Sequence, residues 1–475
     1  MDKLRKDKTT RYLLLLTFVF LSAYIKYAHH ELWKDEWQAW FVAKDKSIGE
    51  IFSFLYYEGH PALWYLYLKI FTIASGVINP VFLISFAHLL IVSAGLYFLF
   101  VRFRLPLVLT TMCALSYFFF FEYGIVNRGY SLVILFTFWA VSLIRDENYN
   151  KYHVGAVLFL LCQTEVSGAL IALVFGFYLF LKIEKSSERI KYTDFYGLAA
   201  GMMIFLVSVF PRASDHVSKT RGKNLSLADN FLTSLQGNLS NTYLIGSTND
   251  TFAFGWTIIG LILSAFCLVG LYYVFKVDKK MLLTYSAYLA IMVAFSFFFF
   301  LGGVRQWGMG FIFLMAMLEI RGINLAKERI SSAIVGIFCI FGMIHNFKAV
   351  REEIRLPFTN AELIGSFIRE KVPIKVPIVA INKFEATPVI GYAGRNFYEL
   401  PDGVEFSYFR WVDRIYIPTE IELKLFARFK GVGGIVILSP KPLEAARYPS
   451  AKLWQKFDGE NYKKENYYLY TLAGK

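Results

Sequence analysis

The sequence of 475 residues is poor in charge, because Asp, Glu, Lys and Arg together make up only 18% of it. Its four cysteines all lie in apolar segments, where neither a disulfide framework nor a zinc-binding spacing is recognisable. Internal repeats and low-complexity tracts are absent, and the C-terminal quarter has no glycine-rich phosphate-binding loop. These absences argue against a disulfide-stapled secreted domain, a zinc module and a repeat protein. We interpret Cys113, Cys162, Cys267 and Cys339 as helix-packing residues.

Apolar side chains are abundant instead. Hydrophobic residues make up 56% of the chain and aromatic residues 18%, a composition typical of a polytopic membrane protein. The formal net charge of +14 would suggest a nucleic-acid partner in a soluble chain, but here the lysines and arginines stand in short clusters between apolar runs. That pattern is the positive-inside signal, so we expect membrane lipids and no nucleic acid as partners.

The first apolar run follows the basic segment MDKLRKDKTTR and ends without a small-residue cleavage site. It therefore indicates a retained anchor in the cell (inner) membrane, with the N-terminus in the cytoplasm. Further apolar runs lie near residues 81–101, 106–121, 129–144, 152–165, 166–182, 194–210, 253–275, 281–301, 307–320 and 331–347.

The segment PALWYLYLKIFTIASG (61–76) fits either a span or a helix lying on the outer surface. If it lies flat, every basic loop falls on one side of the membrane, as the positive-inside rule requires. We therefore predict an α-helical polytopic membrane protein with about eleven transmembrane helices in residues 1–347. Residues 348–475 are expected to form a small α/β domain on the extracytoplasmic side.

Within this C-terminal domain, charged residues return and strand-like runs alternate with amphipathic ones. Strands are predicted at 376–381, 433–439 and 466–472, and helices at 359–372 and 418–431. The segment NFYELPDGVEFSYFRWVD (396–413) combines aromatic and charged residues as sugar-contacting surfaces do, and it fits the edge of a strand-rich core equally well.

An acidic pair, Asp35 and Glu36, follows the first apolar run in ELWKDEWQAW. The tryptophans of this segment mark the membrane surface. A carboxylate pair at that depth costs solvation free energy, which favours a functional role over a simple helix anchor beside Lys34. We therefore expect chemistry on the extracytoplasmic face.

Other candidates lie in predicted exterior turns. His60 belongs to EGHPALWY, where it also fits a helix cap. Arg128 and Arg305 lie where the positive-inside rule makes cations unexpected, although both also fit snorkelling anchors. Glu122 and Tyr130 flank Arg128 in EYGIVNRGY.

The sequence does not decide whether the protein depends on a metal ion. Glu122 and Glu165 fit ordinary turn carboxylates as well as contacts to a sugar hydroxyl or a metal. Asp35, Glu36 and Glu122 would share a divalent cation if they met, but no ligand spacing requires one, and no other cofactor is indicated.

Three features together resemble the GT-C glycosyltransferases. They are Asp-Glu at the exterior end of the first helix, His-Pro before an aromatic helix, and Arg-x-Tyr in the second exterior loop. The most similar branches are the protein O-mannosyltransferases and the bacterial transferases of sugars to lipid A and polysaccharides. The resemblance is clearest over residues 10–210. Ala62 follows His60-Pro61 where the family often has a second proline.

The resemblance implies an integral-membrane glycosyltransferase that moves a hexose or pentose, with inversion, from a polyprenyl-phosphate donor to a glycan, lipid or protein acceptor. A lipid phosphate leaves easily, so one carboxylate base can suffice, and the charge that remains needs a fixed cation. We assign Asp35 as general base and Glu36 as the partner that orients it or holds an ion. We assign Arg128 and Arg305 to binding of the donor phosphate. Further contacts to the substrate are assigned to His60, Glu122 and Tyr130.

Other functional classes fit part of the pattern. A secondary transporter is also polytopic, but it should carry charged or broken helices at mid-bilayer, whereas these runs are nearly free of charge. A non-catalytic scaffold would use the exterior domain to bind a partner. An O-antigen ligase or polymerase would depend on exterior arginine and histidine rather than on an acidic pair.

Overall fold

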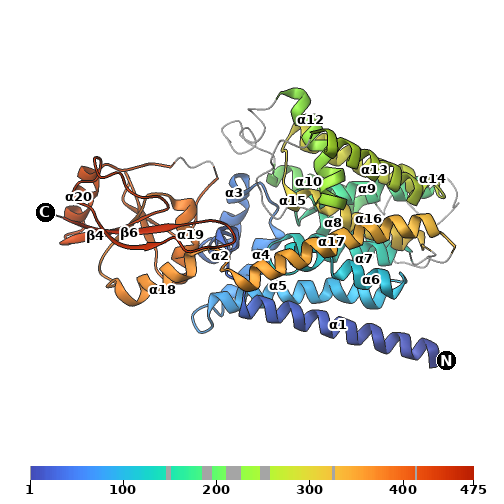
Figure 1. Ribbon diagram of the computed structural model, residues 1–475, viewed down its shortest axis with the longest axis horizontal. Helices are drawn as coiled ribbons and strands as arrows, with labels where there is room; N and C mark the ends of the chain where they lie inside the picture. Colours follow the sequence, from blue (N-terminus) through green and yellow to red (C-terminus); the bar gives the residue numbers. More distant parts are fainter. Residues whose placement is uncertain are drawn as a thin grey trace. The chain divides into compact units, whose positions relative to one another are not determined.

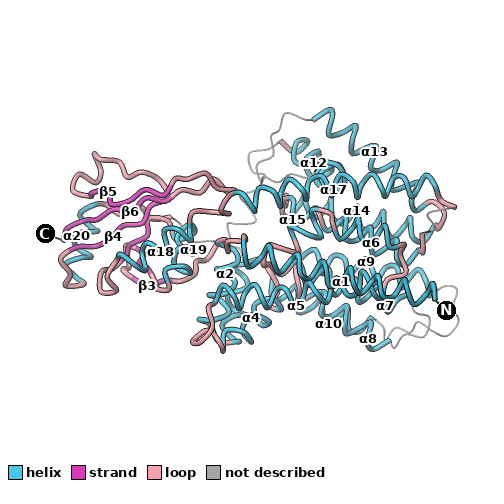
Figure 2. Tube along the Cα trace, turned by 60° about the horizontal axis from the view of Figure 1, so that its bottom comes forward, coloured by secondary structure: helices cyan, strands magenta, loops and turns pink. Residues whose placement is uncertain are grey.

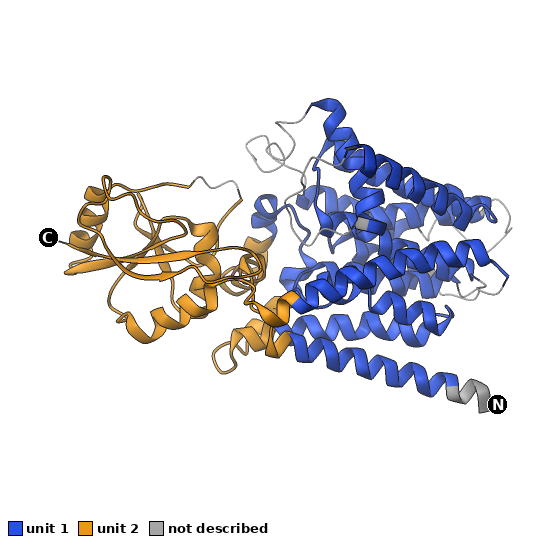
Figure 3. Ribbon diagram, viewed as in Figure 1, with its two compact units in different colours: residues 1–25, 52–67, 85–351 blue, residues 26–51, 68–84, 352–475 orange. Residues whose placement is uncertain are grey.

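The computed structural model describes residues 2–145, 151–183, 195–209, 226–245, 257–323, 327–411 and 415–474. The chain is mostly helical up to Arg355, and a mixed sheet with helices follows (Figures 1 and 2). Two compact units are formed, coloured separately in Figure 3. Unit 1 comprises residues 1–25, 52–67 and 85–351, and unit 2 comprises residues 26–51, 68–84 and 352–475. The predicted domain boundary at 347/348 stays a prediction.

Most of the helices coincide with the apolar runs of the sequence. Up to residue 183 they are α1 (Asp2–Ala28), α2 (Lys34–Asp45), α3 (Ile48–Glu58), α4 (Leu63–Thr72), α5 (Pro80–Tyr97), α6 (Leu107–Ala114), α7 (Tyr130–Arg145), α8 (Lys151–Cys162) and α9 (Val166–Ile183). They continue with α10 (Tyr196–Val209), α12 (Leu227–Gln236), α13 (Thr257–Phe275), α14 (Lys279–Phe298), α15 (Val304–Trp307), α16 (Met309–Arg321) and α17 (Arg329–Arg355). Short π-helical segments are η1 (Phe98–Arg102), η2 (Phe118–Glu122) and η4 (Gly237–Ile245).

Among the described residues, five helices are long and apolar enough to cross a membrane: Asp7–Ala28, Pro80–Arg102, Ile258–Phe275, Lys279–Phe298 and Arg329–Arg355. On α1, Leu13, Leu16 and Phe20 are each at least 60% exposed, which suits a surface that meets lipid rather than water. The structure thus confirms a mostly helical chain with several apolar spans, and the total of eleven stays a prediction.

The segment at 61–76 forms α4, a helix of ten residues. At about 1.5 Å of rise per residue it reaches roughly 15 Å, about half of the hydrocarbon thickness. α4 is therefore too short to be a span, as expected for a helix that lies flat.

Helix α16 is the centre of unit 1, and its residues from Met309 to Glu319 are all buried. The Glu319 carboxylate accepts hydrogen bonds from the backbone N–H groups of Arg104 and Leu105, at 2.8 and 3.0 Å, and pairs with Arg145. This buried charge is therefore compensated by polar partners, as burial requires.

Unit 2 contains a six-stranded sheet in the order β3-β2-β1-β4-β6-β5. Its strands are β1 (Ile378–Ala380), β2 (Phe397–Glu399), β3 (Val404–Phe406), β4 (Gly434–Ser439), β5 (Lys452–Phe457) and β6 (Tyr467–Ala473). Strand β1 runs parallel to β2 and β4, and the remaining pairs are antiparallel. The carboxyl ends of β1 and β2 therefore lie at the same edge of the sheet.

The helices of the C-terminal segment are α18 (Ala361–Lys371), α19 (Lys383–Ala393) and α20 (Glu420–Phe429). Val379 and Ile381 pack in a core with Leu423 and Phe426 of α20. Ile378, whose side chain points to the opposite face of the sheet, is also fully buried. Both faces of β1 are therefore covered, as expected where parallel strands are joined by helices.

The predicted strands at 376–381, 433–439 and 466–472 correspond to β1, β4 and β6, and the predicted helices to α18 and α20. The segment 396–413 contributes the β2–β3 hairpin at one edge of the sheet. Helix α19 and strands β2, β3 and β5 were not predicted individually.

Candidate functional site

The residues singled out in the sequence fall into both units. Asp35 and Glu36 belong to unit 2, whereas His60 and the four candidates from Glu122 to Arg305 belong to unit 1.

Glu36 is the third residue of α2, and its side chain is 1% exposed. Its Oε2 accepts a hydrogen bond of 2.7 Å from the backbone N–H of Trp33, the residue that caps α2. Its Oε1 lies 3.0 Å from Nε2 of His30. Glu36 therefore accepts a hydrogen bond from the backbone N–H of the residue that caps α2, as the acidic residue of a capping box does.

His30 lies between two carboxylates, since its Nδ1 is 2.6 Å from Oε1 of Glu353 on α17 and its Nε2 contacts Glu36. Burial alone would lower the pKa of His30, but Glu36 and Glu353 raise it to about 9. The ring is therefore an imidazolium that donates to both acids. Lys26 of α1 also interacts electrostatically with both carboxylates. His30 was missed because its partner Glu353 is 323 residues away in the chain.

Asp35 is only half-buried, in contrast to Glu36. Adjacent residues of a helix point about 100° apart, so the two carboxylates cannot share one set of neighbours. Lys34, which interacts electrostatically with Asp35, pairs with Glu385 of α19 at 3.0 Å and with Glu465 at 3.5 Å. Burial lowers the pKa of Lys34, but Glu385 and Glu465 raise it, so Lys34 is a fixed cation beside Asp35.

Residues upstream of α2 tie the start of unit 2 to its C-terminal part. Glu31 accepts hydrogen bonds from the backbone N–H groups of Thr359 and Glu362, both at 2.7 Å, at the start of α18. The backbone N–H of Leu32 donates to the Tyr392 hydroxyl at 2.6 Å. The segment that carries Asp35 is thus hydrogen-bonded to the start of α18 and to α19 within unit 2.

In unit 1, Glu122 ends the π-helical turn η2 and is buried. Oε1 of Glu122 accepts from Nε of Arg305 at 2.9 Å, and Oε2 accepts from the Tyr117 hydroxyl at 2.7 Å. Arg305, on the four-residue helix α15, is further fixed by its carbonyl, which accepts from the Tyr123 hydroxyl. Glu122 therefore orients the Arg305 guanidinium.

His60 pairs with Glu165, since its Nδ1 lies 2.6 Å from Oε2 of that residue. Burial would lower the pKa of His60, but Glu165 raises it. The Gly129 backbone passes so close to Glu165 that a Cβ atom at Gly129 would lie 2.8 Å from Oε1. Arg128, next to that glycine, is near enough to His60 to influence it electrostatically. Glu165 was interpreted from sequence as a turn carboxylate, and in the structure it connects His60 to the turn that carries Arg128.

Tyr130 joins this pair to the Arg305 segment. Its hydroxyl accepts a 2.7 Å hydrogen bond from Nε2 of Gln306, and the Arg128 guanidinium lies 5.9 Å from the centre of its ring. The structure therefore gathers His60, Glu122, Arg128, Tyr130 and Arg305 into one cluster, which we call the Arg128–Arg305 cluster. It contains two guanidiniums and a histidine among carboxylates.

A divalent cation would need several convergent oxygen or nitrogen ligands. In the part of the chain that the structure describes, no group of three His, Cys, Asp or Glu side chains has an arrangement that would hold a metal ion.

No protein-family model and no curated protein sequence matches this chain. Solved structures do match it. The apo structure of ArnT from Cupriavidus metallidurans has a TM-score of 0.52 and 10% sequence identity, over 98% of this chain and 98% of that chain. The structure of the same protein bound to undecaprenyl phosphate has a TM-score of 0.52 and 12% identity, over 98% of this chain and 97% of that chain.

ArnT is a GT-C transferase that depends on a polyprenyl-phosphate sugar. At such low identity the likeness concerns the fold, and it extends over nearly the whole length of both chains. The resemblance found in the sequence is thereby confirmed at the level of the fold: this multi-pass membrane protein has an ArnT-like fold.

Proposed function

We propose that the protein is a membrane glycosyltransferase that transfers a sugar from a polyprenyl-phosphate donor to an acceptor on the extracytoplasmic face. The observation that carries the proposal is the fold, which over 98% of the chain resembles a protein that has also been solved with undecaprenyl phosphate bound. The charge pattern supports it, because guanidiniums suit a phosphate and a half-buried carboxylate suits a base.

The Arg128–Arg305 cluster is the proposed phosphate site. Departure of the sugar leaves negative charge on the lipid phosphate, and oriented guanidiniums stabilise that charge without reorganising during the reaction. Glu122 supports this role because it holds Arg305 in one orientation. His60 and Tyr130 are the proposed contacts to the rest of the donor.

The proposed general base is Asp35. It removes the proton of an acceptor hydroxyl as the oxygen attacks the anomeric carbon, and the bond to the lipid phosphate breaks on the opposite side, which inverts the configuration. Glu36 is better suited to positioning, since both of its oxygens are engaged with Trp33 and His30. Lys34 is a fixed cation beside Asp35.

The identity of the transferred sugar is tested by mass spectrometry of cell-envelope glycans from cells with and without the protein. One sugar modification should disappear without the protein and return with the wild type, but not with Asp35→Asn. A scaffold or a transporter would tolerate Asp35→Asn, so full complementation by that variant would contradict an enzymatic role.

The donor site is tested independently by native mass spectrometry of the purified protein with undecaprenyl phosphate. Wild type and Asp35→Asn should both bind the lipid, and Arg128→Ala should bind it clearly less. Equal binding by all three would remove Arg128 from the phosphate site.

A further inference from the structure

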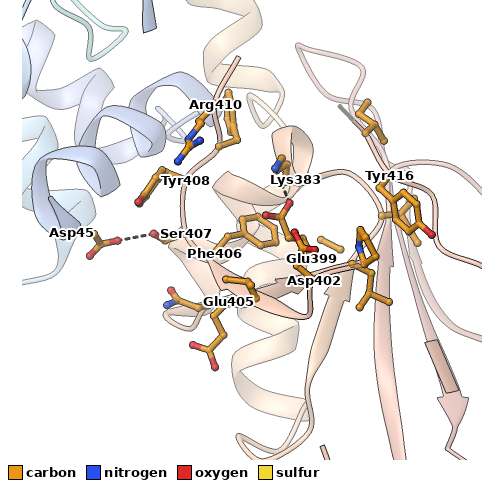
Figure 4. Close-up of a pocket in the computed structure, with 18 residues that line it drawn as sticks. Asp45, Lys383, Glu399, Asp402, Glu405, Phe406, Ser407, Tyr408, Arg410 and Tyr416 are labelled. Carbon is orange, nitrogen blue, oxygen red and sulfur yellow. Dashed lines mark hydrogen bonds and ion pairs between the residues drawn. The ribbon is translucent and has the colours of Figure 1, made fainter. Parts of the chain in front are cut away.

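Unit 2 contains a pocket of about 660 Å³ that the proposed reaction does not use. It lies beyond the carboxyl ends of β1 and β2, where Ile381 and Lys383 follow the first strand and Leu400 to Asp402 follow the second. The segment 407–410 and Asp45 of α2 complete its wall (Figure 4). This edge of an open α/β sheet is where ligands usually bind, and the volume lies within the roughly 300–1,000 Å³ typical of ligand sites.

The charges in the pocket are unbalanced. Four carboxylates, those of Asp45, Glu399, Asp402 and Glu405, line it together with two cations, Lys383 and Arg410. Lys383 donates to Glu399 at 2.6 Å, and Asp45 accepts from the Ser407 hydroxyl at 2.6 Å, as Figure 4 shows. The excess of acids disfavours a phosphorylated or carboxylated ligand, whereas hydroxyl and ammonium groups are the natural donors to such a surface.

The rim of the pocket is apolar. Val404, Ile415 and Tyr416 line it and are 54%, 51% and 40% exposed. Tyr408 supplies a second ring. A saccharide has apolar C–H faces and a hydroxyl-rich edge, so it matches a site that combines exposed rings and aliphatic side chains with carboxylates.

We infer that this pocket is a carbohydrate subsite that holds a neutral or amino-sugar part of the acceptor and rejects anionic sugars. The inference rests on the proposed function, because it identifies the acceptor of that reaction as a glycan or a glycan-bearing molecule. It concerns lining residues within 380–410, together with Ile415, Tyr416 and Asp45, and none of the groups assigned to chemistry.

The test uses the full-length protein in a detergent without a sugar headgroup and measures binding by isothermal titration calorimetry. The probes are three trisaccharides of similar size: neutral triacetylchitotriose, the cationic glucosamine trimer and anionic trigalacturonic acid. Trilysine serves as a cation that is not a sugar. The first two saccharides should bind, and trigalacturonic acid should bind at least about fivefold more weakly.

Two variants identify the pocket as the place of binding. Tyr416→Ala should weaken both bound saccharides by about tenfold, whereas Phe429→Ala, which removes an exposed ring outside the pocket, should not. Asp402→Lys should reduce the preference for the cationic trimer over trigalacturonic acid, and Glu370→Lys on α18 should not.

The inference is overturned if none of the saccharides binds, if all three bind equally, if trilysine binds as tightly as the glucosamine trimer, or if the control variants act like the pocket variants. It fails separately from the proposed function. If the pocket binds no saccharide, binding of undecaprenyl phosphate and its dependence on Arg128 are unaffected. If the Arg128→Ala variant still binds the lipid, the proposed phosphate site is wrong, but saccharide binding in the pocket is unaffected.

Discussion

The two carboxylates of the acidic pair have different surroundings although they are adjacent in sequence. Glu36 is buried and hydrogen-bonded to Trp33 and His30, whereas Asp35 is half-buried beside Lys34. These surroundings are the reason why we propose Asp35 as the general base and give Glu36 a positioning role.

Glu36→Gln should destabilise the protein by about 2 to 3 kcal/mol, because an amide cannot accept from both the Trp33 N–H and the His30 imidazolium and brings a donor into a buried site. Asp35→Asn should change stability by less than about 0.5 kcal/mol, since Asp35 is not fully buried. Thermal unfolding of both variants measures the difference. A larger loss for Asp35→Asn would reverse these structural assignments.

His30 makes the stability of unit 2 depend on pH. Its partners raise its folded-state pKa from the ordinary 6.5 to about 9. Protonated His30 therefore stabilises the folded state fully below about pH 6.5, and this contribution is lost as the pH rises through about 9. The unfolding temperature of wild type should exceed that of His30→Gln most at pH 6, and the difference should shrink toward pH 9.5.

The difference between the two proteins is the relevant quantity, because other groups titrate in the same range. Burial raises the pKa of Glu31 to about 7, and this contribution is common to both proteins. A wild-type advantage that was constant from pH 6 to pH 9.5 would show that His30 is not an imidazolium in the folded protein.

At Arg128 the proposed role depends on the guanidinium and not on charge alone. Arg128→Lys keeps the charge but loses the planar pair of donors, so transfer should remain clearly impaired. Arg128→Ala should lose about 2 to 4 kcal/mol of transition-state stabilisation. The exposed Arg329 on α17 provides the matched control, and Arg329→Ala should transfer normally. Wild-type turnover in Arg128→Ala would exclude the assigned role.

At the scale of elements, α2 is positioned by close packing on α19 within unit 2. A Cβ atom at Gly391 of α19 would lie 2.2 to 2.5 Å from ring atoms of the buried Trp37 on α2. The Trp37 ring also meets Tyr392 edge to face, with ring centroids 5.3 Å apart. The helix that carries Asp35 therefore depends on a glycine in another helix.

Gly391→Ala should therefore destabilise the protein by about 1 to 3 kcal/mol, because the methyl group overpacks a closed contact. Gly433→Ala is the control, since a Cβ atom there meets nothing within 4 Å and its φ is not positive. Unfolding curves of the two variants give the comparison. Equal stability would mean that α2 and α19 pack less closely than described.

Sequence periodicity predicted the elements that have a strong pattern of their own. Helices α18 and α20 each bury one face and are flanked by turn residues, and β4 is a continuous buried run. Helix α19 escaped prediction because Pro388 stands in its interior. Strands β2 and β3 lack the continuous buried run that marks β1 and β4. Strand β2 pairs with the edge of β1, and β3 pairs with β2.

Among the candidate site residues, too, some are recognisable from the sequence alone and others are not. Residue types that are unusual at a membrane surface, such as Asp35 and Arg128, stand out in a single sequence. Their partners do not, because His30 meets Glu353 and His60 meets Glu165 only after folding, across 323 and 105 residues. Contacts over such separations depend on topology, which local patterns do not encode.

At the scale of the whole molecule, the proposed function requires a cytoplasmic N-terminus and an exterior C-terminal segment. Cysteine at Glu370, exposed on α18, should react with a membrane-impermeant maleimide in intact cells, whereas cysteine at the exposed Lys279 should react only after lysis. The native cysteines, Cys113, Cys162, Cys267 and Cys339, are all buried and give little background. Labelling of Lys279→Cys from outside would contradict the predicted topology.

The most direct test of the central claim is the rate of sugar transfer from the polyprenyl-phosphate donor by Asp35→Asn, measured in membranes together with undecaprenyl phosphate binding. The variant keeps the shape of Asp35 and removes its basicity, so transfer should fall by about two to four orders of magnitude while the lipid still binds. Glu36→Gln, compared at a temperature where it is folded, should retain more activity. Full activity in both variants would contradict the glycosyltransferase mechanism, and an inactive Glu36→Gln beside a normal Asp35→Asn would assign the base to Glu36.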